Sequence, residues 1–181
     1  FQLMHIKSQK YLFVDERELT DNNEHTIVAL DEGYRCASWH FRPRFWFQQP
    51  GADIYGGSKV IVYNVQTSRA LAVCSSSKMG HQEVGAGKLV ADVNSFSVEL
   101  YQDSSTLMID QELLLGGTAI RLFNRERSCL MTAKEAYGSP VLTHSKYHQL
   151  MEPGYNLHSI FVIEHVNNTQ GGPITVSGRY Q

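Results

Sequence analysis

The sequence has little of what marks metal-binding, disulfide-rich or membrane proteins. Its 181 residues include 3 cysteines, Cys36, Cys74 and Cys129, and these form no CxxC pair. This usage predicts free thiols in a reducing compartment and argues against a zinc site or a disulfide framework. No apolar run reaches the ~18 residues of a membrane span. No signal peptide opens the chain, which begins inside an alternating pattern, so we expect it to be part of a longer protein.

The chain also lacks an excess of charge of either sign and lacks the motifs of common enzymes. It has 16 Lys and Arg against 18 Asp and Glu, a formal net charge of -2. This balance argues against a nucleic-acid partner bound by bulk electrostatics. There is no Gly-x-Ser-x-Gly, His-Glu-x-x-His or phosphate-binding glycine loop. We therefore expect neither an enzyme nor a cofactor.

An internal repeat of about sixty residues is the strongest pattern that the sequence contains. A strand, a polar turn and a second strand occur at residues 2–12, 61–71 and 120–130. The closing leucines, Leu12, Leu71 and Leu130, are spaced 59 residues apart. Such self-similarity predicts one structural unit used several times.

Glycines and aromatics repeat with the same units. The pairs Gly56-Gly57 and Gly116-Gly117 are 60 residues apart, and Gly171-Gly172 follows. Because paired glycines tolerate the positive φ of tight turns, we interpret them as unit boundaries. Each unit ends on a strand with a large aromatic, and these are Trp39, Phe96 and Phe161. The predicted units are 1–55, 56–115 and 116–170, with 171–181 starting a further strand.

Three units of about four short strands, without a sustained helical period, predict an all-β fold, a single β-trefoil over residues 1–181. A β-sandwich is the alternative, although it requires no threefold period. Strand alternation predicts these core residues: Leu3, Leu12, Val14, Val28, Trp39, Val62, Leu71, Val73, Val90, Phe96, Leu122, Leu130, Val141 and Phe161.

Two motifs in this sequence are specific, namely the opening run Phe1 to Leu12 and the stretch Leu115-Gly-Gly-Thr-Ala-Ile-Arg-Leu-Phe123. Both resemble the MIR repeat, and within that class they are most similar to the N-terminal region of inositol 1,4,5-trisphosphate receptors. The similarity is collinear over about residues 1 to 165 and is weak between about 75 and 115. It implies that the first two units correspond to the suppressor-type trefoil and the third to the start of the ligand-binding β domain.

The resemblance also implies a ligand site. In these receptors, a loop after a strand carries Arg-Thr-Thr-Gly-Arg, which contacts the ligand phosphates. The matching stretch here puts His144, Ser145 and Lys146 at the two threonines and the glycine, and Thr143 and Tyr147 at the arginines. Among these residues only Lys146 is permanently cationic, whereas a polyphosphate favours several arginines.

By this resemblance, the chain is a non-catalytic regulatory module of an inositol 1,4,5-trisphosphate receptor-like calcium-release channel. The implied partners are neighbouring domains of the same channel and inositol 1,4,5-trisphosphate, within a homotetrameric parent. The implied location is the cytosolic face of the endoplasmic reticulum or another calcium store. The alternative is a luminal MIR protein of the O-mannosyltransferase or stromal-factor type that binds peptide or glycan. A secreted lectin- or cytokine-like trefoil is a third reading, but its motifs are missing.

Two further clusters contain side chains that could form a site. His144, His148 and His158 have one spacing suited to a metal, but no third ligand is fixed, so solvent-exposed loop histidines are favoured. Arg42, Arg44 and Lys59 flank Phe45-Trp46-Phe47. We interpret this group as core or as a contact between domains, because Trp and Arg often anchor such contacts.

Overall fold

The computed structural model describes residues 1–19, 26–31, 37–44, 49–73, 84–87, 94–101, 112–136, 139–146, 156–165 and 172–176. Within them, twelve strands follow one another, and a 3-10 helix, η2 (Asn156–Ser159), precedes the last strand. The strands of the first unit are β1 (Gln2–His5), β2 (Lys10–Leu19), β3 (Thr26–Asp31) and β4 (Trp39–Pro43). Those of the second are β5 (Lys59–Asn64), β6 (Ala70–Val73), β7 (Val84–Gly87) and β8 (Ser95–Leu100). Those of the third are β9 (Ala119–Asn124), β10 (Cys129–Ala136), β11 (Ser139–Lys146) and β12 (Phe161–Glu164).

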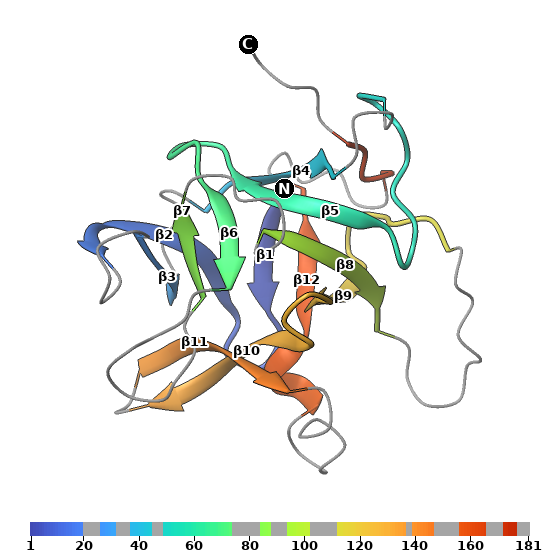
Figure 1. The fold of residues 1–181 in the computed structure, drawn as a ribbon. Coiled ribbons are helices and arrows are strands. Elements are labelled where there is room, and N and C mark those ends of the chain that lie inside the picture. Colours follow the sequence, from blue (N-terminus) through green and yellow to red (C-terminus); the bar gives the residue numbers. More distant parts are fainter. Residues whose placement is uncertain are drawn as a thin grey trace.

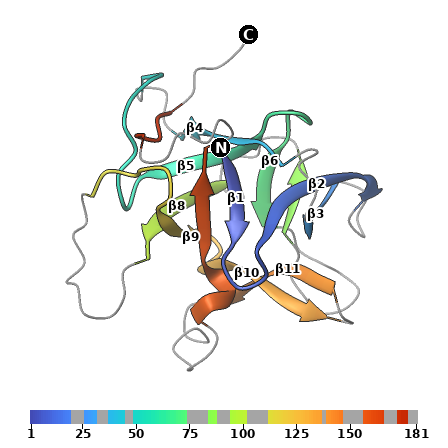
Figure 2. The same cartoon turned by 180° about the vertical axis from the view of Figure 1, so that it is seen from behind.

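The first and fourth strands of each unit form a barrel. Antiparallel pairing joins them in the order β4, β5, β8, β9, β12 and β1. The ring closes where the Trp39 N–H donates to the Phe1 carbonyl at 2.8 Å. Figures 1 and 2 show these strands around one common centre.

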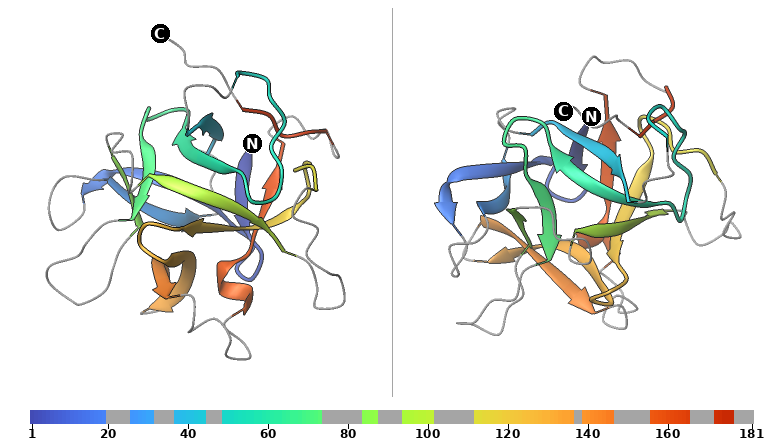
Figure 3. Two further views of the ribbon diagram at one scale, coloured as in Figure 1. Left: turned by 45° about the vertical axis from the view of Figure 1, so that its right-hand side comes forward. Right: turned by 45° about the horizontal axis from the view of Figure 1, so that its top comes forward.

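The second and third strands of each unit form hairpins that cap one end of this barrel. The hairpins are β2–β3, β6–β7 and β10–β11, and β3 pairs with both β7 and β11. The two views in Figure 3 show the hairpins gathered at the end of the barrel away from residues 172–176, which are coloured dark red. A barrel of paired strands with three capping hairpins is a β-trefoil, so the predicted fold class is confirmed.

The repeat predicted from the closing leucines is also confirmed. Leu12, Leu71 and Leu130 lie near the starts of β2, β6 and β10, and each is at most 1% exposed. The unit-ending aromatics Trp39, Phe96 and Phe161 lie in β4, β8 and β12 and are fully buried. Equivalent positions in the three units therefore occupy equivalent environments.

The predicted core is buried wherever the structure describes its side chains. This holds for Leu3, Leu12, Val14, Trp39, Val62, Leu71, Val73, Phe96, Leu122, Leu130 and Phe161. Val28 and Val141 lie in β3 and β11, but their side chains, like all of Val90, lie outside the described part. The core also includes residues that we did not predict, namely Phe41, Ile54, Val60, Val98, Leu114, Ile120, Met131, Ile163, Ile174 and Val176.

A ring of three backbone hydrogen bonds closes the other end of the barrel. The N–H of Ile54 donates to the carbonyl of Ile174 (3.2 Å), that of Leu114 to Ile54 (2.7 Å), and that of Ile174 to Leu114 (2.9 Å). The side chains of Ile54, Leu114 and Ile174 are buried at this end of the core. In Figure 1 the three segments, coloured teal, yellow and red, meet at the upper right. Residues 172–176 thus complete the threefold arrangement that 52–56 and 112–116 begin.

Two of the glycine pairs, Gly56-Gly57 and Gly116-Gly117, lie in equivalent turns. Gly57 and Gly117 have φ of +81° and +88°, which an L side chain rarely adopts. Gly171-Gly172 is not the third member of the series. Val176 donates to Ala52 just as Gly56 donates to Glu112 and Gly116 to Gly172, so Val176 takes the third place. This explains why the last glycine pair follows at 55 residues instead of 60.

Candidate functional site

The residues predicted to bind ligand lie inside a strand. His144, Ser145 and Lys146 form the end of β11 and pair with Met131, Leu130 and Cys129 of β10. Their backbones therefore sit in the capping hairpin of the third unit, not in the loop that follows it. Their side chains, and all of Tyr147 and His148, lie outside the described part. Their role in ligand binding stays a prediction.

Each barrel strand that opens a unit ends in a turn held by a buried side chain. In the second and third units Asn64 and Asn124 are fully buried, and their Oδ1 atoms accept the N–H of Thr67 (3.0 Å) and Arg127 (2.9 Å). The last residue of each turn has positive φ, which is 56° at Gln9, 55° at Ser68 and 48° at Ser128. Asn and Asp favour such turns because their side chains bond the backbone nearby.

His5 replaces this asparagine in the first unit. Its side chain is 2% exposed, and Nδ1 accepts the Ser8 N–H at 3.3 Å. Nε2 is buried and has no hydrogen-bond partner among the described residues. Burial lowers the pKa of His5, which keeps the ring neutral and able to accept this bond.

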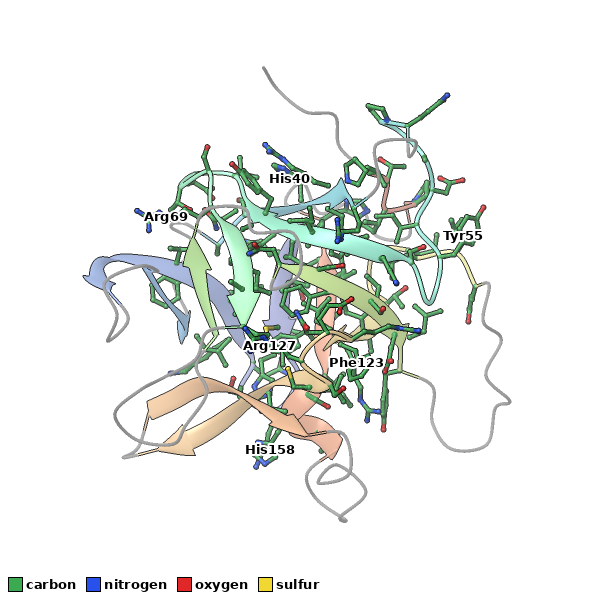
Figure 4. The ribbon with its side chains drawn as sticks, viewed as in Figure 1. His40, Tyr55, Arg69, Phe123, Arg127 and His158 are labelled. Atoms are coloured by element: carbon green, nitrogen blue, oxygen red, sulfur yellow. The ribbon has the colours of Figure 1, made fainter. Side chains whose placement is uncertain are left out.

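Lys7 and His158 tie the same turn to the third unit. His158 Nδ1 donates to the Ala133 carbonyl at 2.8 Å, and its Nε2 lies 3.0 Å from Lys7 Nζ. In Figure 4, His158 lies near the lower edge of the molecule, below the β10–β11 hairpin. No group of three or more His, Cys, Asp or Glu suited to a metal occurs in the described ranges.

The outside of β8 and β9 carries a charged cluster. Glu99 lies opposite Arg121 in the ladder, and Arg125 Nε donates to Ser97 Oγ at 3.1 Å. Burial raises the pKa of Glu99, although the positive charges of Arg121 and Arg125 oppose the rise. The Arg121 guanidinium carbon lies 5.1 Å from the centre of the Tyr101 ring. These charges are partly balanced within the chain.

The outside of β4 and β5 carries a cation with different surroundings. The guanidinium carbon of Arg42 lies 3.5 Å from the centre of the Tyr63 ring, and its Nε donates to His40 Nε2 at 2.9 Å. His40 and Tyr63 are cross-strand neighbours with ring centres 5.2 Å apart. Burial, assisted by the charge of Arg42, lowers the pKa of His40 to about 4. His40 is therefore neutral at pH 7, and its Nε2 accepts a hydrogen bond from Arg42 instead of carrying a second positive charge beside it.

Cys129 is a buried free thiol, as the cysteine usage predicted. Burial raises its pKa to about 11, so the reactive thiolate is scarce at neutral pH. Cys36 and Cys74 lie outside the described ranges. Separately, no helix in the described part of the chain is long and apolar enough to cross a membrane.

The sequence matches one family model over the first two units. Residues 1–107 match the model described as inositol 1,4,5-trisphosphate/ryanodine receptor. The chain belongs to the inositol 1,4,5-trisphosphate/ryanodine receptor family. This confirms the resemblance inferred from the two motifs, and the matched range ends before the Leu115 to Phe123 motif.

Several solved structures of proteins with low sequence identity share the fold of this receptor-family chain. A chain of the protein O-mannosyltransferase Pmt1–Pmt2 complex of S. cerevisiae is 14% identical, with a TM-score of 0.71 over 98% of this chain. The present chain spans 26% of that one. The SDF2-like protein of Arabidopsis thaliana is 13% identical, with a TM-score of 0.70 and 89% of each chain covered. The designed threefold symmetric protein ThreeFoil is 12% identical, with a TM-score of 0.59, and 91% of this chain and 97% of that chain are covered. At these identities the likeness concerns the fold alone.

Sequence reasoning missed the Arg42 arrangement in part. The sequence pattern points to Arg42, but it groups this residue with Phe45-Trp46-Phe47, which lies outside the described part of the chain. The partner that matters is Tyr63, which is distant in sequence and adjacent across the β4–β5 ladder. Alternation in both strands was the available signal, because it puts His40, Arg42 and Tyr63 on the same outward face.

Proposed function

We propose that the chain is a non-catalytic regulatory module of an inositol 1,4,5-trisphosphate receptor-like calcium-release channel. It couples ligand binding to gating through contacts with neighbouring domains of the same channel. The parent is a homotetramer, and the module lies on the cytosolic face of the endoplasmic reticulum or another calcium store. The observation that supports this proposal is the family match over residues 1–107.

The architecture is suited to transmitting force and unsuited to large internal change. The barrel is closed at one end by three hairpins and at the other by the Ile54, Leu114 and Ile174 ring. Closely packed interiors deform little, so such a body moves as a unit when a ligand shifts the angle between domains. We propose that residues 1–181 act as one trefoil in this way, with the unit boundaries given above.

The ligand contact is proposed at the end of β11, at His144, Ser145 and Lys146. Only Lys146 supplies a permanent charge there, so most of the phosphate contacts must come from outside these residues. The proposal therefore predicts weak binding by residues 1–181 alone and stronger binding by the full-length protein.

Titration of the full-length protein with inositol 1,4,5-trisphosphate tests the proposed ligand contact, and a calcium-release assay tests the proposed function. Lys146→Ala should weaken binding by roughly 10- to 150-fold, since a charge-assisted contact contributes about 1.5–3 kcal/mol. Lys10→Ala, in the capping hairpin of the first unit, is the matched control and should leave affinity unchanged. Calcium release from vesicles that contain the full-length protein should likewise be reduced by Lys146→Ala and unchanged by Lys10→Ala. Equal affinity in both variants would remove the β11 assignment, and a protein that neither binds the ligand nor releases calcium would remove the proposed function.

The luminal alternative rests on structural likeness to the mannosyltransferase and SDF2-like proteins, which concerns the fold alone. The free, buried Cys129 is consistent with a reducing compartment, which favours the cytosolic reading. Protease protection of the full-length protein in sealed microsomes separates the two, because the luminal alternative predicts protection.

A further inference from the structure

We propose that the outer face of β4 and β5 binds a carboxylate of an acidic segment in a neighbouring domain of the parent protein, with Arg42 as its anchor. This inference rests on the proposed function, which supplies the neighbouring domain. The outer face meant here consists of His40 and Arg42 on β4 and of Lys59, Ile61 and Tyr63 on β5.

Strand alternation fixes which side chains form this face. Trp39 and Phe41 of β4 are fully buried and point into the barrel, so the residues between and after them point outward. His40 lies opposite Tyr63, and Arg42 lies opposite Ile61. Figure 4 shows His40 on the outside of the barrel, beside β4.

Two neighbours hold the Arg42 side chain in one conformation. The Tyr63 ring lies beneath the guanidinium, 3.5 Å from its carbon, and His40 Nε2 accepts the Nε–H at 2.9 Å. A free arginine loses rotamer entropy when it is immobilised by a partner. Because much of this ordering already exists in the unbound chain, a partner that binds here does not have to supply it.

The binding capacity of this cation is not used within the described part of the chain. Stacking and the His40 bond leave the N–H donors of both Nη atoms, which form the planar fork that matches a carboxylate. Within the described ranges Arg42 has no carboxylate partner. His40 is neutral at pH 7, and Lys59 on the same face adds a second positive charge.

Comparison with the other two units shows that this arrangement is specific to the first. In the fold, Arg42 is equivalent to Glu99 on β8 and to Glu164 on β12. Glu164 accepts the Tyr11 hydroxyl at 2.7 Å, and Glu99 is opposite Arg121. Both glutamates thus interact with groups of this chain, whereas Arg42 replaces an acidic residue by a cation whose complement must come from elsewhere.

A protein carboxylate fits this face better than a polyphosphate or a nucleic acid does. One oriented arginine and one lysine provide few charges, whereas a polyanion is bound by several cations together. The arginine fork stacked on an aromatic ring, next to the nearly buried Ile61, resembles the anchors found in protein interfaces.

Zero-length cross-linking in the full-length protein tests this inference. A carbodiimide joins an amine to a carboxylate in direct contact, so Lys59 reports on any carboxylate held next to Arg42. We expect mass spectrometry to find Lys59 linked to an Asp or Glu of the parent protein outside residues 1–181. Arg42→Gln should reduce that cross-link by roughly 10-fold or more, because charge-assisted hydrogen bonds are lost. Arg42→Lys should reduce it as well, since an ammonium group cannot form the fork.

Arg127→Gln is the matched control, because Arg127 is an exposed arginine in the β9–β10 turn, and its cross-linking should equal that of the wild type. Equal melting temperatures would show that the Arg42 variants are folded. Three results would overturn the inference. They are a Lys59 cross-link found only within residues 1–181, one found only to a separate protein, and one that survives Arg42→Gln. Loss of the cross-link in the presence of inorganic phosphate at low millimolar concentration would also overturn it, because this loss would indicate a phosphate site. Ligand titration of the same variants is independent, so failure of the proposed function would be seen separately.

Discussion

Replacing Trp39 by phenylalanine is the sharpest test of the threefold equivalence. Trp39 occupies the position that Phe96 and Phe161 occupy in the other units, and all three are fully buried. It differs in one contact, because its Nε1–H donates to the Leu12 carbonyl at 2.9 Å. If the positions are equivalent, the backbone should accept a phenylalanine, and the cost should come only from the lost bond and the lost volume.

The expected magnitude follows from these two terms. Loss of the hydrogen bond, which leaves a buried carbonyl without this donor, costs about 1–3 kcal/mol. The smaller ring leaves a gap that costs about 1 kcal/mol more, since each buried methylene-sized group contributes about that much. Trp39→Phe should therefore lower the free energy of unfolding by about 2–4 kcal/mol. Trp39→Ala, which removes the whole side chain, should cost about 4–5 kcal/mol or prevent folding.

Urea denaturation of the 181-residue chain, followed by far-UV circular dichroism, measures this difference. Val65→Ala is the control for a hydrophobic truncation, because Val65 is 51% exposed and should change stability by less than about 0.5 kcal/mol. The equivalence would be refuted if Trp39→Phe were as damaging as Trp39→Ala. An effect below about 0.5 kcal/mol for Trp39→Phe would refute the energetic role of the Leu12 bond.

Three further predictions concern the turns, the titrating groups and the thiol. Asn124→Ala should lower the free energy of unfolding by about 1–2 kcal/mol in urea titration, because the Arg127 N–H loses its acceptor. Ser128→Gly should leave this free energy unchanged or raise it, because Ser128 has a positive φ that glycine adopts readily. His40 should titrate near pH 4 by NMR, because its pKa is lowered in the folded state. The stability that it contributes should be complete above about pH 6.5 and should be lost as the pH falls toward 4. A His40→Gln variant whose stability depends on pH as the wild type does would contradict this. Cys129 should resist iodoacetamide at pH 7.5 until the chain unfolds, as peptide mapping would show, and rapid labelling in the native state would contradict its burial.

The fold was predictable because the same strand–turn–strand pattern occurs three times in the sequence. A single run such as residues 61–71 would be an ambiguous hairpin, but the recurrence of buried Leu12, Leu71 and Leu130 at one spacing leaves few architectures. Inward and outward positions followed from alternation alone, which explains why the predicted core was found buried where the structure describes it.

The closure of the barrel end and the surface clusters were not predictable in the same way. The ring of Ile54, Leu114 and Ile174 is made by backbone groups in short irregular segments, where alternation gives no signal. Gly171-Gly172 gave a misleading spacing, because the position equivalent to Gly56 and Gly116 is Val176. The ligand-site residues were placed in a loop by resemblance, yet the structure continues β11 through Lys146. Contacts such as Arg42 with Tyr63 require the pairing register, which the sequence does not state.

The three units agree inside the barrel and differ outside it, and this contrast indicates where function lies. The inward positions of β4, β8 and β12 are large and apolar in every unit, as Phe41, Val98 and Ile163 illustrate. The outward position next along the same strands is Arg42 in the first unit and glutamate in the other two. Packing constrains the inner positions equally, since each must fill the same core around one axis. It places no such demand on the outer positions, so a charge reversal there, held rigidly by His40 and Tyr63, is explained better by a partner than by folding. Reverting it with Arg42→Glu should therefore leave the melting temperature nearly unchanged while abolishing the Lys59 cross-link, and a large loss of stability instead would mean that Arg42 serves the fold.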